Sequence, residues 1–338
     1  MSKIQWTDET WNPAVGCAKV SAGCRGCYAE RDALRVLRQM EGRSGKSPTP
    51  NQQAVIDAYS QVVEVTEGGR GRWTGRAVPV AGSRIADPLR WTTPRMVFVN
   101  SMSDLFHEDL PFEWIAAVFG VMAASPQHTF QVLTKRPARA LEFFRWLDLQ
   151  ADVGVKDDDL DTKRQSRARL LLESIAETPA GETPAHKLSA LSGEWPLPNV
   201  WLGVSVEDQA TANERVSLLL QCPAAIRFVS YEPALGAVEF RRFLVPRHAV
   251  GLDWIIVGGE SGPFARRFDV AWARDTVEQC AAAGVPVFIK QLGSAPVRAA
   301  EGKDPRREIP VRLVDRKGGN PDEWPGGLNV RQWPAAPK

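Results

Sequence analysis

Six short and largely apolar runs constrain the fold of this chain more than any other feature. They share β-rich composition and lie at residues 96–100, 130–134, 200–204, 226–230, 254–257 and 285–289. Runs without polar alternation are typical of strands that are buried on both faces, as in a parallel sheet. We expect a further strand near residues 11–15.

Segments with helical periodicity follow most of these runs. Pro111 and Pro137 each open an amphipathic segment, and residues 207–222 and 270–283 carry the same pattern, the latter before Gly284. Proline is favoured in the first turn of a helix, and glycine just after its last turn. Alternating strands and helices indicate a parallel α/β fold. The sequence therefore predicts a full or partial (β/α) barrel of the TIM type, with a doubly wound open sheet as the alternative.

The length of 338 residues suggests about two domains, but a single barrel can also reach this size. We predict one barrel-like domain over residues 1–338. Residues 43–76 are rich in Gly, Ser and Pro around a helical middle, and residues 152–198 are charged and then rich in Pro and Ser. Both interrupt the rhythm of the fold and are predicted insertions, whereas residues 293–338 are predicted to form a surface tail.

Composition narrows the class of protein. The chain has 42 Lys+Arg and 40 Asp+Glu, a net charge of +2, which argues against coating nucleic acid mainly by charge. Its hydrophobic fraction of 43% excludes a wholly disordered chain. The first residues contain no apolar signal core, and the apolar stretch 114–124 is too short to span a bilayer. We therefore expect a cytoplasmic protein without a membrane partner.

Three of the five cysteines, Cys17, Cys24 and Cys27, fall within eleven residues. They lie on a glycine-bearing loop between a predicted strand and a helix that begins near Tyr28. Three thiolates on one loop can converge on one soft metal centre. The positive end of the helix favours the thiolate form of Cys27. The other two cysteines, Cys222 and Cys280, are predicted core residues.

The number of clustered cysteines bears on the metal. A structural zinc site closes with four ligands, so zinc would need a distant residue such as His107 or Cys222. A cubane [4Fe–4S] cluster held by three cysteines leaves one iron open for another ligand. The number of cysteines favours the iron–sulfur cluster. A zinc site is the first alternative, and three unrelated structural cysteines are the second.

Polar or ionisable residues follow the predicted strands one after another. They are Asn100 with Ser101 and Asp104, Lys135, Ser205 with Glu207, Glu232, Glu260, and Lys290 with Gln291. In a parallel barrel the carboxyl ends of the strands surround one mouth, where active sites form. The sequence therefore predicts one shared site. The basic pair Arg266–Arg267 is expected instead on the solvated surface.

Residues 6–30, which carry the three cysteines, resemble the signature of a phage-associated family with a three-cysteine motif. The likeness continues through residues 100–106, 133–137, 203–207, 230–233, 258–262 and 290–291. That family in turn resembles radical S-adenosylmethionine enzymes, including spore photoproduct lyase. The common spacing in those enzymes is Cys-x3-Cys-x2-Cys, whereas six residues separate the first two cysteines here.

The resemblance implies an enzyme in which the three cysteines hold a [4Fe–4S] cluster and the open iron binds S-adenosylmethionine. An electron donor would reduce the cluster, and the resulting 5′-deoxyadenosyl radical would act on a substrate. The residues proposed for the cofactor are Tyr28, Asn100, Ser101, Asp104, Ser205, Gly258, Gly259 and Glu260. Those proposed for catalysis are Lys135, Glu207, Glu232 and Lys290.

Some of these assignments have specific reasons. Asn100, Ser101 and Asp104 follow an early strand, where radical S-adenosylmethionine enzymes bind the methionyl amino group. The segment 258–260 resembles the Gly-Gly-Glu motif used for that group but comes much later in the chain, and its glycines would let backbone approach a ligand. Lys135 and Lys290 would hold a carboxylate or a phosphate.

Two other functions stay open. A barrel hydrolase would use Glu232 and Glu260 as paired carboxylates but would leave the three cysteines without a role. A non-catalytic module that carries zinc would bind nucleic acid or a partner protein. For the radical enzyme, a nucleobase, DNA, a peptide and a partner protein all fit as the substrate.

Overall fold

The structure is a computed structural model that describes residues 4–42, 47–151, 162, 166–167, 170–171, 173–175, 194–245, 250–300 and 308–335. The chain divides into two compact units. Unit 1 comprises Met1–Val20, Cys27–Trp201 and Cys222–Ala225, and unit 2 comprises Ser21–Gly26, Leu202–Gln221 and Ile226–Lys338. The prediction of one barrel-like domain stays a prediction.

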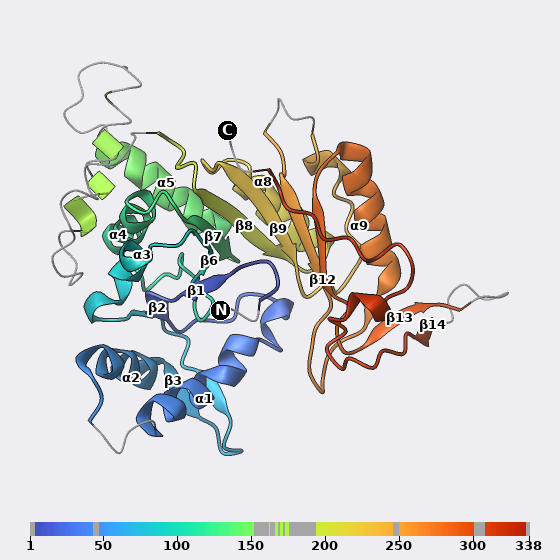
Figure 1. The fold of residues 1–338 in the computed structure, drawn as a ribbon, viewed down its shortest axis with the longest axis horizontal. Helices are drawn as coiled ribbons and strands as arrows, with labels where there is room; N and C mark the ends of the chain where they lie inside the picture. Colours follow the sequence, from blue (N-terminus) through green and yellow to red (C-terminus); the bar gives the residue numbers. More distant parts are fainter. Residues whose placement is uncertain are drawn as a thin grey trace. The chain divides into compact units, whose positions relative to one another are not determined.

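Helices and strands alternate along most of the chain (Figure 1). The helices are α1 Tyr28–Gly42, α2 Pro50–Val62, α3 Asp87–Arg90, α4 Phe112–Ala123, α5 Pro137–Ala151, α8 Gln209–Leu219 and α9 Val270–Ala283. The strands of the main sheet are β1 Glu9–Trp11, β6 Met96–Val99, β7 Thr129–Thr134, β8 Val200–Val206, β9 Ile226–Tyr231, β10 Trp254–Gly258 and β12 Val287–Gln291. The short strands are β2 Ala14–Val15, β3 Val63–Val65, β4 Gly71–Trp73, β5 Val78–Pro79, β11 Phe268–Asp269, β13 Pro296–Ala299 and β14 Glu308–Pro310.

The main sheet has seven parallel strands in the order β1-β6-β7-β8-β9-β10-β12. All residues of β8 and β10 are buried, as expected for strands covered on both faces. Within the described residues the order has two ends, β1 and β12, so the sheet is open. The parallel α/β fold is confirmed, and the full barrel is excluded in favour of a partial one.

The expected strand near residues 11–15 is in fact two strands in two sheets. β1 pairs with β6 in the main sheet, whereas β2 pairs with β5 in a two-stranded sheet. Asn12 and Pro13 lie between them. Proline cannot donate a ladder hydrogen bond, which explains the break. The Oδ1 atom of Asn12 instead accepts hydrogen bonds from the Ser101 hydroxyl at 3.1 Å and the Met102 amide at 2.9 Å.

The helices of unit 1 form two groups. Helices α4 and α5 pack together with aromatic contacts between Phe119, Phe143 and Phe144. Helices α1 and α2 pack with the β3–β4 hairpin around a separate apolar cluster that includes Tyr59 and Trp73 (Figure 1). None of the helices in the described ranges is long and apolar enough to cross a membrane.

The structure describes most of the first predicted insertion but only a small part of the second. From residue 47 to residue 76 the first contains α2 and the hairpin, and Thr49 begins α2 with a capping box to Gln52. Residues 43–46 lie outside the described residues. Most of the second predicted insertion, residues 152–198, also lies outside them.

Unit 2 contains β9, β10 and β12 with helix α9. Gly284 ends α9 in the left-handed conformation, with φ 67°, as its position after the helical pattern predicts. The predicted surface tail also contributes strands and a buried side chain. It contains β13 and β14, Leu328 is fully buried, and Ile289 of β12 donates its amide to the Val330 carbonyl at 2.8 Å.

Candidate functional site

Each clustered cysteine directly follows a glycine, and the structure gives each glycine a reason. In unit 1, Gly16 precedes Cys17 and has φ 91°, a conformation that favours glycine. A methyl group at this position would overlap the Arg76 carbonyl oxygen. Gly16 also pairs with Ser103 and donates its amide to the Met102 carbonyl at 3.1 Å. Cys17 is thereby fixed beside the chain that follows β6.

Cys17 and Cys27 both pack against the apolar cluster of α1, α2 and the hairpin, as does Met102. Both cysteines are half-buried. Cys27 directly precedes α1, and its carbonyl accepts the Arg31 amide at 3.3 Å. An apolar surround limits solvent access to a metal site and thereby tunes the bound metal. Two thiols at the border of one apolar cluster therefore fit an iron–sulfur ligand set.

Asn100, directly after β6, is the most unusual polar residue of unit 1. Its φ of 59° lies in the left-handed region, and only 2% of its surface is exposed. Neither atom of its side-chain amide has a hydrogen-bond partner among the described residues. A buried polar group without a partner costs about 1–3 kcal/mol. Such a residue at a strand end is a candidate for binding a ligand.

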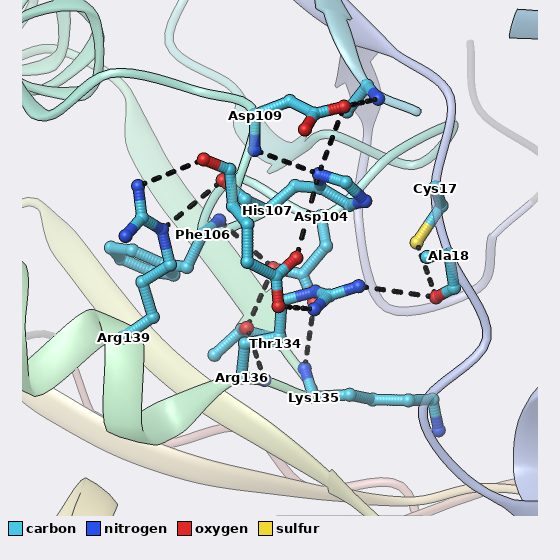
Figure 2. A network of polar contacts seen from close by, with 12 residues as sticks. Cys17, Ala18, Asp104, Phe106, His107, Asp109, Thr134, Lys135, Arg136 and Arg139 are labelled. Carbon is cyan, nitrogen blue, oxygen red and sulfur yellow. Dashed lines mark hydrogen bonds and ion pairs between the residues drawn. The ribbon is translucent and has the colours of Figure 1, made fainter. Parts of the chain in front are cut away.

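The neighbours of Asn100 are, in contrast, held by the protein itself. The Ser101 carbonyl accepts a hydrogen bond from the Tyr28 hydroxyl at 2.9 Å. The Asp104 carboxylate accepts three: from the Thr134 hydroxyl at 2.7 Å and from the amides of Phe106 and Lys135, each at 3.0 Å (Figure 2). Asp104 thus ties the end of β6 to the end of β7, and its predicted role toward a cofactor stays a prediction.

His107 carries a second buried polar atom without a partner. Its Nδ1 accepts the Asp109 amide at 3.2 Å, while its Nε2 has no partner among the described residues. Burial lowers the pKa of His107 from its ordinary value, and the positive charge of Arg136 lowers it further. The neutral imidazole is the form that ligates metals.

Arg136, one residue after Lys135, connects this network to the cysteine loop. Its guanidinium forms an ion pair with Glu108 and donates to the Ala18 carbonyl at 3.3 Å (Figure 2). Ala18 follows Cys17, so Arg136 helps to hold the loop on that side. Arg136 is not among the site residues predicted from the sequence, although its place directly after a polar strand end was a usable signal.

In unit 2, Glu207 follows β8 and is only 1% exposed. It forms an ion pair with Arg215 at 3.1 Å and accepts the Ser21 hydroxyl at 2.8 Å. Ser21 opens the segment Ser21–Gly26, which contains a single 3-10 turn at Ala22–Cys24. Gly23 lies so close to the Glu207 carboxylate that a methyl group there would overlap it. The Sγ of Cys24 lies 3.9 Å from the Ser21 Oγ.

Glu260, two residues after β10, contacts the same segment. Arg266 binds its carboxylate through two parallel hydrogen bonds of 2.8 Å each, and these raise the pKa of Arg266 above its ordinary value. Arg266 also donates to the Ala22 carbonyl at 2.8 Å. A methyl group at Gly26 would overlap the Glu260 carboxylate. The expectation that Arg266 is solvated surface was wrong; it serves a partly buried ion pair.

The remaining strand ends of unit 2 are also engaged. Lys290 and Glu232 form an ion pair at 2.6 Å, and Gly258 packs against the Glu232 carboxylate. Gln291 donates to the Gly259 carbonyl at 2.8 Å. A hydrolase that used Glu232 and Glu260 as its catalytic pair would have to open two ion pairs first.

The predicted site residues thus fall into two sets. Unit 1 holds Cys17, Cys27, Tyr28, Asn100, Ser101, Asp104 and Lys135, and unit 2 holds Cys24, Ser205, Glu207, Glu232, Gly258, Gly259, Glu260 and Lys290. Cys222 and Cys280 are buried as predicted, and burial raises the pKa of Cys280 to about 12. In the described ranges, no group of three or more His, Cys, Asp or Glu side chains is arranged to hold a metal ion.

Comparison with known proteins gives one match. A family model described as a protein of unknown function, DUF5131, matches residues 1–309. No curated protein and no solved structure matches the chain.

Proposed function

This chain belongs to the DUF5131 family of proteins of unknown function, and from its own site we propose that it is an enzyme of the radical S-adenosylmethionine type. Cys17, Cys24 and Cys27 would be the protein ligands of a [4Fe–4S] cluster. The proposal for the three together rests on their spacing in the sequence and on the resemblance of residues 6–30.

The observation that carries the proposal is the repeated Gly-Cys dipeptide. Gly16, Gly23 and Gly26 each lie where a methyl group would overlap a neighbouring group. The backbone directly before each thiol is therefore pressed against a fixed partner. Functional sites need their ligands preorganised by such supporting contacts. Three unrelated structural cysteines would not require this arrangement.

The surroundings of the thiols support a redox cofactor. Cys17 and Cys27 border an apolar cluster, which would exclude water from a cluster bound there. Asn100 would supply one donor and one acceptor to the polar end of S-adenosylmethionine, because its amide has no partner among the described residues. Tyr28 and Ser101 would complete that side, and Lys135 would receive a carboxylate or phosphate of the substrate.

When bound, such a cluster would supply one-electron reduction of the sulfonium of S-adenosylmethionine, with an external electron donor, as the chemistry that leads to removal of a hydrogen atom from a substrate. The protein's share is orientation and exclusion of side reactions. Asp104 would keep the ends of β6 and β7 in place through its three hydrogen bonds. Arg136 would hold the loop at Ala18.

The test is formation of 5′-deoxyadenosine. Protein reconstituted anaerobically with iron and sulfide is mixed with dithionite and S-adenosylmethionine, and the nucleoside is measured by chromatography. The proposal predicts its formation by the wild type and by Cys222→Ala, and none by Cys27→Ser. Wild-type protein that retains its cluster yet forms none contradicts the proposal.

A zinc-bearing binding module is the second candidate, favoured by one observation. The Nε2 atom of His107 is buried without a partner among the described residues, and it belongs to the same unit as Cys17. A neutral imidazole would complete a Cys3His zinc site. This candidate predicts that purified protein holds zinc and that His107→Ala loses it, whereas the radical enzyme predicts iron in both proteins.

A further inference from the structure

We propose that Glu207 and Glu260 are positioning residues, which hold the segment Ser21–Gly26 in place for the thiol of Cys24. The inference deepens the proposed function, on which it rests for the use of Cys24 as a cluster ligand. The contacts themselves lie wholly within unit 2.

Glu207, which contacts the segment, is one partner of a buried ion pair. Glu207 and Arg215 have side chains that are 1% and 5% exposed, and Arg215 also donates to the Ser205 carbonyl at 2.8 Å. Apolar side chains of similar volume often stabilise a protein as well as a buried ion pair does. A contribution to the stability of the fold is therefore not a sufficient reason for Glu207 and Arg215 to be charged. Glu207 also makes a specific contact with the segment, because the Ser21 hydroxyl donates to its carboxylate at 2.8 Å.

Glu260, which also contacts the segment, forms a bidentate ion pair with Arg266. Arg266 binds both carboxylate oxygens of Glu260 and uses a third nitrogen to donate to the Ala22 carbonyl at 2.8 Å. Arginine offers donors in a rigid fork, so one side chain can hold the carboxylate and the segment at once. Its neighbour Arg267 pairs with Glu308 and makes no contact with the segment among those described.

Two glycines bring the backbone of the segment onto these carboxylates. Gly23 lies against Glu207 and Gly26 against Glu260, each without room for a methyl group. Cys24 lies between the two glycines in the sequence, so the segment is fixed on both sides of its thiol. A segment ordered before metal binds does not have to lose conformational entropy at that step.

Arg215 and Arg266 balance the negative charges of the two carboxylates that support the segment. Two bare carboxylates beside a thiolate would disfavour its negative charge. Arg215 and Arg266 pair with Glu207 and Glu260, so the support for Cys24 adds little net negative charge to an anionic metal site.

The segment contains a site that reports on its opening, because Arg25 is exposed and lies between Cys24 and Gly26. Trypsin cleavage after Arg25 measures how often the segment opens when opening is fast relative to cleavage. We expect Ser21→Ala and Arg266→Gln to be cleaved there about tenfold faster than the wild type, since each loses a hydrogen bond to a charged group. Arg267→Gln is the matched control and should be cleaved at the wild-type rate, as should Ser21→Thr, which keeps the hydroxyl.

A glycine pair gives an independent version of the test. Gly26→Ala should also be cleaved about tenfold faster, because its methyl group displaces the segment from Glu260. Gly68→Ala adds a methyl group where nothing lies within 4 Å and should leave the rate unchanged. Melting temperatures are measured beside the rates. Faster cleavage after Arg25 at unchanged melting temperature supports the proposal; unchanged cleavage, or faster cleavage only in step with global unfolding, overturns it.

Iron content separates this inference from the proposed function. After anaerobic reconstitution, Arg266→Gln should lose iron to a chelator about tenfold faster than Arg267→Gln does. Equal loss from the two variants overturns the positioning role. A wild type that binds no iron while the cleavage differences persist would refute the cluster and leave the support of the segment standing.

Discussion

The cysteine-bearing regions of the two units treat their buried polar groups in opposite ways. In unit 1, near the strand end that adjoins Cys17, Asn100 and the Nε2 of His107 have no hydrogen-bond partner among the described residues. In unit 2, Glu207 and Glu260 each have a cation and each contact the Cys24 segment. Unsatisfied groups cost stability unless a ligand completes them, whereas satisfied networks make a structure rigid. From this difference we propose that the first region binds the ligand and that the second supports the Cys24 segment.

The largest expected effect comes from the cysteines themselves. Cys17→Ser, Cys24→Ser and Cys27→Ser should each lose nearly all bound iron after anaerobic reconstitution, because the proposed cluster would have only these three thiolates as its protein ligands. Cys222→Ala removes a buried thiol and should retain the wild-type content. Iron is measured per polypeptide. Full retention by any one of the three serine variants would remove that cysteine from the ligand set.

The support in unit 2 should be costly to break. Arg215→Met leaves Glu207 buried without its cation and should lower the free energy of unfolding by about 3–5 kcal/mol. Arg241→Met breaks the exposed pair with Glu239 and should cost less than about 1 kcal/mol. Urea denaturation of both variants measures the difference. Similar small losses would mean that the buried pair does not support the region.

In the proposed binding region of unit 1, removal of a buried polar side chain should instead raise the free energy of unfolding. Asn100→Gly removes a buried amide without a partner and relieves a positive φ, so we expect the free energy of unfolding to rise by about 1 kcal/mol. Asn12→Ala is the comparison, because the Asn12 side chain accepts two hydrogen bonds, and it should lower stability by about 1–2 kcal/mol. A marked loss of stability in Asn100→Gly would show that the protein itself uses this amide.

The smallest effect is a pH dependence from His107. Its pKa is lowered in the folded protein, so the unfolded chain takes up a proton near the ordinary value of 6.5 that the folded chain does not. Its contribution to stability is therefore fully present above pH 6.5 and is lost as the pH falls toward the folded pKa. The loss cannot exceed about 1.4 kcal/mol per pH unit.

His107→Asn keeps an acceptor for the Asp109 amide and should lack this loss. Urea midpoints of the two proteins are compared between about pH 8 and about pH 5. A constant difference between them over that range would mean that His107 titrates alike in both states.

Much of the fold could be predicted from the sequence, because buried parallel strands leave an unmistakable pattern. All six apolar runs are strands, and α9 has the predicted bounds before Gly284. The split between β1 and β2 escaped prediction, since the side chain of Asn12 replaces the ladder there. Whether the barrel closes depends on pairing between the first and last strands, which no local pattern encodes.

The candidate site could be predicted by residue type but not by role. The polar strand ends were identifiable, yet the cationic partners Arg215 and Arg266 come from a helix and a loop, where an arginine normally indicates surface. The Gly-Cys repeat was present in the sequence. Its meaning depends on Arg76, Glu207 and Glu260, which are far away along the chain.

The most direct test of the central claim is the metal content of protein purified without oxygen. Iron, acid-labile sulfide and zinc are measured per polypeptide in the wild type, together with the low-temperature electron paramagnetic resonance spectrum after reduction. The cluster account predicts about four iron and about four sulfide per chain and the spectrum of a reduced cubane. One zinc per chain with no iron or sulfide, before and after reconstitution, would contradict it.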